Sequence, residues 1–242
     1  MEKTTGDYMN LKHSEAFGFI TKLFLAPVGP LQYIFDRPGT THMYCLNQAL
    51  ELLGRDGRDE VAATFAPYRT PLIKGLLWAD RGWKNVCHYF TLPDKQGGLP
   101  WPGAMAECQH YFNKAGGVLG KHIHKGMFYL GAALHLVQDM CVPHHAVGSV
   151  FDGHQEFERW AARHWQEYPA GNSGLYLKFT HPSQWIEHNA RRAARYYSLV
   201  SQEQGCSEET YAKAAAALLP LTIQSTAGFL AFTQDLWQKA PW

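Results

Sequence analysis

Apolar residues recur at helical spacing along most of the chain after residue 40. The clearest case is "GMFYLGAALHLVQDMCV", where apolar side chains fall on one stripe of a helix. They are Met127, Leu130, Leu134, Val137 and Cys141. Pro143 should end this helix, because the residue before a proline disfavours helical backbone. The pattern therefore predicts a helix that stops ahead of Pro143.

Other stretches show the same period and are also predicted to be helices. They are residues 41–57, 154–168, 181–202 and 207–238. Thr41 is the expected N-cap of the first, and Gly54 and Gly57 suit its C-terminal end. Pro220 should kink the last of them or divide it in two. With no long alternating strand pattern and no internal repeat, the sequence predicts an all-α fold with short connections.

The helical pattern predicts a single-domain helical bundle over residues 41–242, preceded by an N-terminal extension, residues 1–40, that packs on the core. The stretch "LPDKQGGLPWPG" is rich in proline and glycine and is expected to be a surface loop. In the extension, Lys22 interrupts the apolar patch "AFGFITKLFLAPVGPL", and no clear cleavage site follows. We interpret the patch as an amphipathic helix, not a signal peptide, which favours a cytoplasmic protein over a secreted one.

Composition narrows the classes of partner. The chain has 242 residues, of which 46% are hydrophobic and 18% charged, as in a folded globular protein. Its formal net charge of +1 gives no overall attraction to nucleic acid or to an anionic membrane. No run approaches the roughly 18 apolar residues that a membrane-spanning helix needs. We therefore expect neither a stable nucleic-acid complex nor a transmembrane segment; the oligomeric state is left open.

The cysteines point away from disulfides and thiolate metal sites. There are five, at irregular spacing and without a CxxC pair: Cys45, Cys87, Cys108, Cys141 and Cys206. Cys45 and Cys141 stand among apolar residues and are expected to act as small core side chains.

The candidate chemistry lies in "LHLVQDMCVPHHAVGSVFDGHQEFE". His135 and Asp139 are four residues apart and share a helix face with Gly131. Because glycine has no side chain, this position leaves space for another group to approach. His154 and Glu158 repeat the spacing on the next helix. Histidine and carboxylate ligands at such spacing suit zinc or a similar divalent ion. One such pair is usually an ordinary hydrogen bond, so spacing alone leaves both a metal site and a hydrogen-bonded cluster open.

Taken together, these segments resemble the bacterial zinc-dependent phospholipases C, the group that includes the catalytic domain of clostridial α-toxin. "GMFYLGAALHLVQDMCVPHHA" is similar to the family's His-x-x-x-Asp helix and its Pro-x-His-Ala turn, and "GHQEFERWA" to its His-x-x-x-Glu. "THMYCLNQALELL" resembles the first core helix with its leading histidine, and "LLWAD" and "CHYF" the segments with an Asp and a His ligand. The resemblance covers roughly residues 40–238, with the segments in the family's order, and implies the helical fold shared by zinc phospholipases C and single-strand nucleases.

The resemblance implies three metal positions. The first would use Asp80, His88, His135 and Asp139; the second His145, His154 and Glu158; and the third His42 together with Asp139, which would bridge two ions. Asp80 would also orient or deprotonate the attacking water. The implied cofactor is Zn²⁺, two or three ions per chain, and the implied substrate is a phospholipid or another phosphodiester.

The sequence departs from the family at the third position. Mature family members begin with a tryptophan whose amine and carbonyl complete that position, whereas this chain has Gly29 there and its first tryptophan is Trp78. Two alternatives stay open: the N-terminal segment supplies a substitute such as His13, or only two ions bind. A further hypothesis is that residues 1–41 fold over the cluster and alter substrate access.

The resemblance thus implies a metal-dependent phosphoric diester hydrolase, a phospholipase C acting on glycerophospholipids through metal-activated water. The alternatives are a single-strand-specific nuclease or a specialised-metabolism enzyme on the same scaffold, or a metal-stabilised protein that has lost turnover. The near-neutral charge gives the nuclease little support, since that activity needs a basic groove with stacking aromatics.

Overall fold

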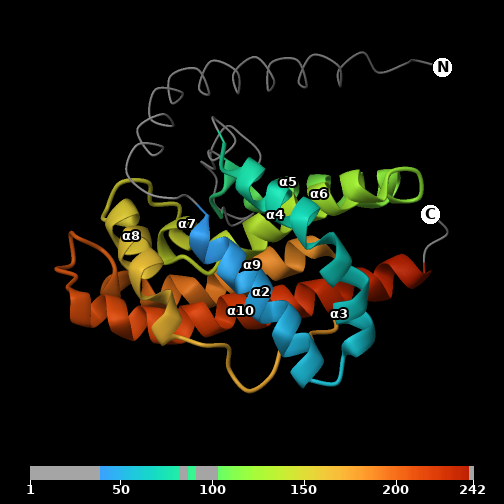
Figure 1. The fold of residues 1–242 in the computed structure, drawn as a ribbon. Helices are drawn as coiled ribbons and strands as arrows, with labels where there is room; N and C mark the ends of the chain where they lie inside the picture. The colour runs from blue at the N-terminus through green and yellow to red at the C-terminus, as the bar shows by residue number, and fades with distance from the viewer. Residues whose placement is uncertain (1–38, 82–86, 91–102, 240–242) are drawn as a thin grey trace, which may run out of the picture.

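Helices account for the architecture of the part of the chain that the computed structural model describes, residues 39–81, 87–90 and 103–239 (Figure 1). No strand occurs among these residues, so the all-α prediction is confirmed for them. The α-helices are α2 (Thr40–Arg55), α3 (Asp59–Phe65), α4 (Arg69–Ala79), α5 (Ala104–Leu119), α6 (Ile123–Asp139), α7 (Pro143–Val147), α8 (His154–His164), α9 (Pro182–Ala193) and α10 (Glu208–Lys239). Shorter 3₁₀ helices are η2 (Ala66–Tyr68), η4 (Trp165–Glu167) and η5 (Ala194–Leu199).

Some expectations concern residues outside these ranges. They are the packing of the N-terminal extension, the substitute ligand His13, and the surface loop up to residue 102. These stay predictions.

Helix α6 forms the centre of the fold. It packs against α4 and α5, and α10 and α9 also contact it. Every residue in 130–139 is buried, as expected of a helix covered on all sides. His135 and Asp139 are therefore held away from bulk water. A lone charge would be costly in this buried position.

Two glycines allow α4 and α6 to cross closely. A Cβ at Gly131 would lie 2.1 Å from the carbonyl oxygen of Leu72, and one at Gly75 would lie 1.8 Å from that of Phe128. The space expected at Gly131 is thus filled by the backbone of α4. This close crossing brings Asp80, the C-cap of α4, to the face of α6 that carries His135.

Helix boundaries differ from the prediction at α2. The helix begins at Thr40 with Gly39 as N-cap, in the left-handed region at a φ of 86°, so the N-cap expected at Thr41 is wrong. At the other end Gly57 has a φ of 69°, and this left-handed residue stops the helix as predicted.

The two prolines have different effects on their helices. Helix α6 ends at Asp139, ahead of Pro143 as predicted, and Pro143 begins the short helix α7, where its missing N–H costs nothing. Helix α10 continues through Pro220 over 32 residues, so its division into two helices is wrong.

Helix α10 is long and apolar enough to cross a membrane by length and composition, the one such helix among the described residues. Of its most apolar window 78% is buried inside the fold, and it packs along α2 and α6. Such burial is typical of the core helix of a helical domain.

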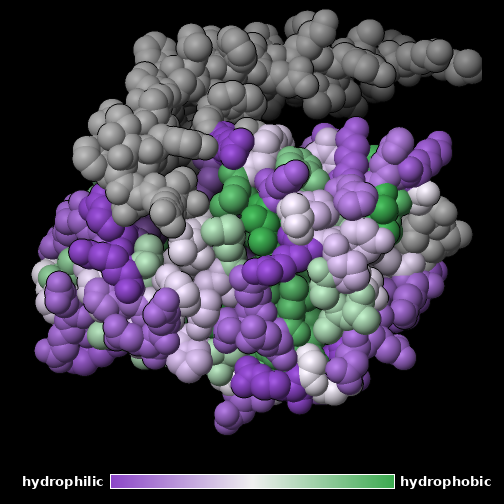
Figure 2. All heavy atoms as spheres, in the orientation of Figure 1, coloured by the Kyte–Doolittle hydropathy of each residue, from purple (hydrophilic) through white to green (hydrophobic). Residues whose placement is uncertain are grey.

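The remaining core follows the amphipathic pattern. Cys45 and Cys141 are buried among apolar residues, as predicted, and the five cysteines form no disulfide. On the face seen in Figure 2, hydrophilic residues cover most of the surface, and hydrophobic residues gather near its middle.

Candidate metal centre

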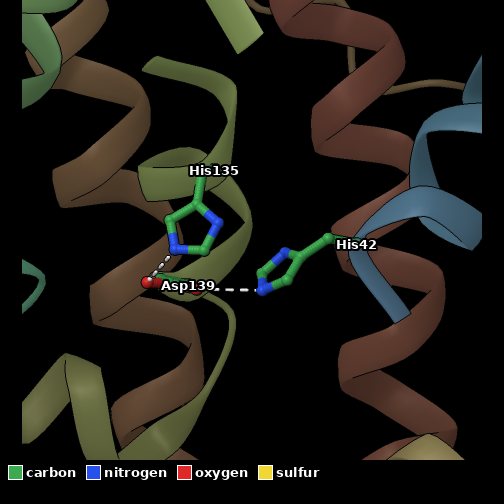
Figure 3. Close-up of side chains that lie close together, drawn as sticks. All are labelled: His42, His135 and Asp139. Atoms are coloured by element: carbon green, nitrogen blue, oxygen red, sulfur yellow. Dashed lines mark ion pairs between the residues drawn. The ribbon is translucent and has the colours of Figure 1, made fainter. Parts of the chain in front are cut away.

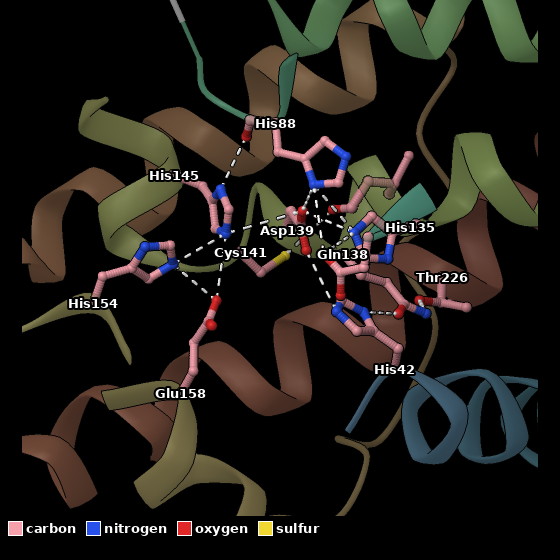
Figure 4. Close-up of polar contacts among 12 residues, drawn as sticks. His42, His88, His135, Gln138, Asp139, Cys141, His145, His154, Glu158 and Thr226 are labelled. Atoms are coloured by element: carbon pink, nitrogen blue, oxygen red, sulfur yellow. Dashed lines mark hydrogen bonds and ion pairs between the residues drawn. The ribbon is translucent and has the colours of Figure 1, made fainter. Parts of the chain in front are cut away.

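All eight residues predicted as metal ligands lie together in the structure. They are His42 on α2, Asp80 at the end of α4, His88 in the segment 87–90, His135 and Asp139 on α6, His145 on α7, and His154 and Glu158 on α8. Side chains from six separate parts of the chain thus meet at the C-terminal end of α6 (Figure 4). Their ligand atoms fall into three groups, each with all its ligand atoms within 4.8 Å of one another.

The first group joins Asp80, His88 and His135. The Nε2 atom of His135 lies 3.4 Å from an oxygen of Asp80 and 3.3 Å from Nδ1 of His88. Both histidines are buried, whereas the Asp80 side chain is 42% exposed. This carboxylate therefore forms an edge of the site that solvent reaches.

Asp139 stands between the first group and His42. Its Oδ2 atom lies 2.9 Å from Nδ1 of His88 and 3.1 Å from Nε2 of His135, and its Oδ1 atom lies 3.4 Å from Nε2 of His42 (Figure 3). Each carboxylate oxygen thus faces a different set of nitrogens. This division is the geometry that a bridging carboxylate needs.

The remaining group joins His145, His154 and Glu158. The Nε2 atoms of His145 and His154 lie 3.1 Å apart. Oε1 of Glu158 lies 3.3 Å from Nε2 of His145 and 2.9 Å from Nε2 of His154. His145 also lies 3.9 Å from Asp139, which connects this group to the others. The Glu158 side chain is 40% exposed, so the group opens to solvent on that side.

The grouping agrees closely with the implied ligand sets. The second group has the implied members, His145, His154 and Glu158. The first group has Asp80, His88 and His135, and the fourth implied member, Asp139, contacts both of its histidines. The third group contains His135 in addition to His42 and Asp139.

Opposite charges dominate the electrostatics of the site. Burial opposes ionisation of Asp139, but His135 and His145 outweigh it and hold the carboxyl pKa well below its usual value. Burial likewise opposes ionisation of Glu158, and His154 and His145 lower its pKa well below the usual range. Both carboxylates are therefore charged at neutral pH.

The first group shows a similar balance. Burial disfavours the charged form of Asp80, yet the neighbouring His135 brings the net pKa below its ordinary value. The pKa of His135 is raised well above normal because the carboxylates of Asp139 and Asp80 outweigh its burial. For His88 burial wins, and its pKa is lowered despite the contact with Asp139.

The ligand atoms fit a cation. Ring nitrogens face each other at 3.1 Å between His154 and His145 and at 3.3 Å between His135 and His88, where at most one of each pair can donate a proton. The buried Oδ2 of Asp139 has no hydrogen bond of normal geometry despite its close nitrogens. Imidazole nitrogens with carboxylate oxygens are a ligand set that zinc prefers.

Outer contacts fix the direction of the ligand nitrogens. The Nδ1–H of His145 donates to the carbonyl oxygen of His88 at 3.0 Å, which leaves Nε2 for the second group. The Phe90 amide donates in turn to the carbonyl of His145 at 2.9 Å. These bonds join the segment 87–90 to α7, although 57 residues separate His88 from His145.

Gln138 orients His42 and was not predicted from the sequence. The Nδ1–H of His42 donates to Oε1 of Gln138 at 2.7 Å, and Nε2 of Gln138 donates to the Thr226 hydroxyl at 3.1 Å. The Thr226 hydroxyl donates to the Thr222 carbonyl at 2.7 Å. This chain directs Nε2 of His42 at Asp139. Its only sequence signal is a polar residue on a buried helix, because Thr226 lies 88 residues away.

His144 packs behind the second ligand group. From its place next to His145 in the sequence, this side chain could either support a ligand or face solvent. It is fully buried and stacked on His154, with 5.1 Å between ring centroids. Its Nε2–H donates to the Asp152 carbonyl at 2.7 Å. Burial lowers its pKa to about 4, so the ring is neutral at physiological pH.

Tyr89 is a further neighbour that the sequence did not single out. Its ring lies 5.0 Å from that of His145, and burial together with the charge of Glu158 raises its pKa. Its ring also lies 6.2 Å from that of His154, so it packs against the second ligand group.

The described residues thus form an all-helical fold around a candidate centre for several metal ions. Residues 41–204 match the family described as zinc dependent phospholipase C. The chain belongs to this family. Phospholipase C of Bacillus cereus is 25% identical over 195 residues, which cover 72% of this chain and 68% of that protein.

Solved structures share the fold. The alpha toxin of Clostridium absonum superposes with a TM-score of 0.64 at 18% identity, over 84% of this chain and 65% of the toxin chain. The alpha-toxin of an avian strain of Clostridium perfringens superposes with a TM-score of 0.65 at 20% identity, over 85% of this chain and 66% of the toxin chain. This chain therefore spans just under two thirds of the length of the toxins that it matches.

Proposed function

We propose that this protein is a zinc-dependent phosphodiester hydrolase that cleaves glycerophospholipids as a phospholipase C. Family membership and the similarity to a protein named phospholipase C support the reaction class. The observation that carries the proposal is the convergence of eight ligand side chains, with Asp139 facing two groups at once.

The three groups would together hold two or three zinc ions. Asp80, His88, His135 and Asp139 would hold the first, His145, His154 and Glu158 the second, and His42 with Asp139 the third. Bound zinc supplies positive charge and Lewis acidity, which favour attack of water on a phosphodiester. Two of the carboxylates, Asp80 and Glu158, are partly exposed, so a substrate phosphate can approach from their side.

Asp80 would act on the attacking water. Its carboxylate is at the solvent edge, and its lowered pKa keeps it ionised at neutral pH. An ionised carboxylate in this place can accept a hydrogen bond from a water molecule, orient it, and take up its proton. Buried His88 and His135 would hold Asp80 in position through their contacts with Oδ1.

The test compares substrates with and without metal. We expect zinc-loaded protein to hydrolyse a soluble phosphocholine ester, to lose this activity with a chelator, and to regain it when zinc is returned. Hydrolysis of single-stranded DNA in preference to the ester would contradict the phospholipase assignment. Zinc binding without hydrolysis of any phosphodiester would indicate a protein that keeps the cluster and has lost turnover.

A matched pair of variants tests Asp80. Asp80→Asn should lower kcat on the soluble ester by about 100-fold or more, because a positioned general base contributes at least this factor. Asp235→Asn, a surface carboxylate on α10, should keep the wild-type kcat. Equal rates for the two variants would exclude Asp80 from the reaction.

A further inference from the structure

The loop that joins α7 to α8 exposes apolar side chains. Val147 is 42% exposed, Val150 43% and Phe151 78%. Elsewhere among the described residues, Ile123 is the one other large hydrophobic side chain that is exposed. We call residues 147–153 the apolar loop. Three exposed apolar side chains within five residues form a contact surface unlike the rest of the described chain.

Hydrogen bonds hold the apolar loop in one conformation. The Asp152 carboxylate accepts from the Tyr197 hydroxyl at 2.6 Å and from the Glu203 amide at 2.8 Å. The Tyr197 hydroxyl also lies 2.9 Å from Oγ of Ser149, and His144 donates to the Asp152 carbonyl. Phe151 therefore projects from an anchored loop, and the fold keeps it in water although burial would be favourable.

The apolar loop borders the metal centre. It begins two residues after His145 and ends one residue before His154, and both belong to the second ligand group. His144 contacts the loop at Asp152 and the ring of His154. Anything bound to the loop therefore lies close to the second ligand group, of which Glu158 is the partly exposed member.

Charge narrows the class of partner. Residues 140–158 contain no lysine or arginine but include Asp152, Glu156 and Glu158. This stretch of chain itself supplies no lysine or arginine for the phosphates of a nucleic acid or for an anionic membrane. Apolar side chains without cations suit a layer of zwitterionic lipids, which they enter through the hydrophobic effect alone.

We propose that the apolar loop is the contact by which the protein binds a zwitterionic phospholipid layer, with Val150 and Phe151 entering the layer beside the metal centre. The proposal rests on the proposed function, because a phospholipase must bring the phosphate of a packed lipid to its ligand groups. Contact through the apolar loop would hold the second ligand group next to the lipid phosphates.

The test uses full-length, zinc-loaded protein and vesicles of a phosphonate analogue of phosphatidylcholine, whose carbon–phosphorus bond resists hydrolysis. Binding is measured by flotation. The double variant Val150→Ser with Phe151→Ser should bind these vesicles at least about tenfold more weakly than wild type, because two apolar side chains no longer enter the layer. Raising the salt concentration should leave wild-type binding unchanged, since no cations take part.

Ile123→Ser is the matched control, because it removes an exposed apolar side chain at the start of α6, at the opposite end of that helix from the ligands. It should leave vesicle binding at the wild-type level. Equal binding by the double variant and wild type would overturn the proposal. So would a fall in oligomer mass in the double variant, which would mean that a second copy covers the loop.

A third result would also overturn the proposal. If the double variant melts many degrees below wild type while vesicle binding is unchanged, the chain itself covers the loop. The vesicle assay needs no turnover, so it can fail or succeed independently of the proposed function, which is measured on the soluble ester. In natural phosphatidylcholine vesicles, the ratio of vesicle to soluble-ester turnover should fall at least about tenfold in the double variant.

Discussion

Asp139 contacts histidines of all three ligand groups. Its two oxygens face His88 and His135 on one side and His42 on the other, and His145 lies 3.9 Å away. A ligand that bridges two ions is the position where a small change has the largest effect, because both ions lose a negative ligand at once.

Asp139→Asn should therefore weaken two metal positions and lower turnover of a soluble phosphodiester by at least about 100-fold. Zinc per chain, measured by elemental analysis, should fall, while Asp235→Asn on the surface keeps the wild-type value. Full zinc content in Asp139→Asn would show that this carboxylate is not a ligand.

Gln138 acts on the metal centre through His42. Gln138→Leu keeps the side-chain volume but removes the acceptor for Nδ1–H of His42, so the ring loses its fixed direction. Loss of such an outer contact typically costs 10–100-fold in metal affinity, and we expect about this loss at the His42 position alone. Competition with a chromogenic chelator measures it, and Gln109→Leu on the outer side of α5 serves as control. Unchanged affinity would mean that Gln138 does not orient His42.

The candidate ligands could be predicted from the sequence, but the residues that orient and surround them could not. His135 with Asp139 and His154 with Glu158 follow helical spacing, and the order of segments supplied the rest. Gln138 and Tyr89 carry no local pattern, because their partners come from distant elements. The sequence leaves open whether His144 is buried, since one histidine beside another gives no sign of which faces the core.

The crossing of α4 and α6 sets the geometry of the first ligand group. Gly131 lies one turn before His135, and the backbone of Leu72 occupies the space beside it. Any separation of these two helices would also move Asp80 away from His135.

Gly131→Ala should destabilise the protein by about 1–3 kcal/mol or more, because the added methyl group meets backbone that cannot move aside cheaply. Gly117→Ala on α5 is the control: its Cβ meets open space, so the change should be neutral or stabilise by up to about 1 kcal/mol. Urea unfolding of both variants gives the two free energies. Equal stability of the two variants would contradict the close crossing.

At the element scale, periodicity predicted that helices exist but not how they end. The stripe in residues 126–142 correctly marked α6, and its burial on all sides came from neighbours that the pattern does not reveal. Gly39 replaced Thr41 as the N-cap of α2, since a left-handed glycine ahead of a helix gives a weaker signal than a hydroxyl side chain. Pro220 did not divide α10, because packing along the core holds that helix together.

Across the whole molecule, Asp56 joins the end of α2 to a segment more than a hundred residues later. Its carboxylate accepts from the Gly174 amide at 2.7 Å and from the hydroxyls of Ser173 and Tyr176. Burial opposes ionisation, but these hydrogen bonds, led by that of Gly174, bring the Asp56 pKa below its ordinary value of 3.8. The stabilisation is therefore fully present above pH 3.8 and is lost as the pH falls through the folded-state pKa.

Asp56→Ala should cost about 1 kcal/mol at pH 7, since the site is only part-buried and solvent weakens its hydrogen bonds. The difference from wild type in the free energy of unfolding should shrink below about pH 3.8. Urea titrations at several pH values measure it, with Asp235→Ala as the control for loss of a surface charge. A difference that grows on acidification would contradict the assigned pKa direction.

The whole-molecule prediction from sequence reached the all-α fold and the family. Helical periodicity supports the fold class, and the order of the ligand segments is specific because six separate parts of the chain must each supply a residue. The path of the chain between those elements could not be predicted. Contacts such as that of Asp56 with Gly174 depend on packing, not on local pattern.

The metal centre is tested most directly by the zinc content per chain of protein purified without chelator and without an affinity metal. We expect two or three zinc ions per chain, with loss of the second position in a variant that combines His154→Ala and Glu158→Ala. No zinc, even after zinc is added, would mean that the converging side chains are only a hydrogen-bonded histidine cluster, and the proposed function would be wrong.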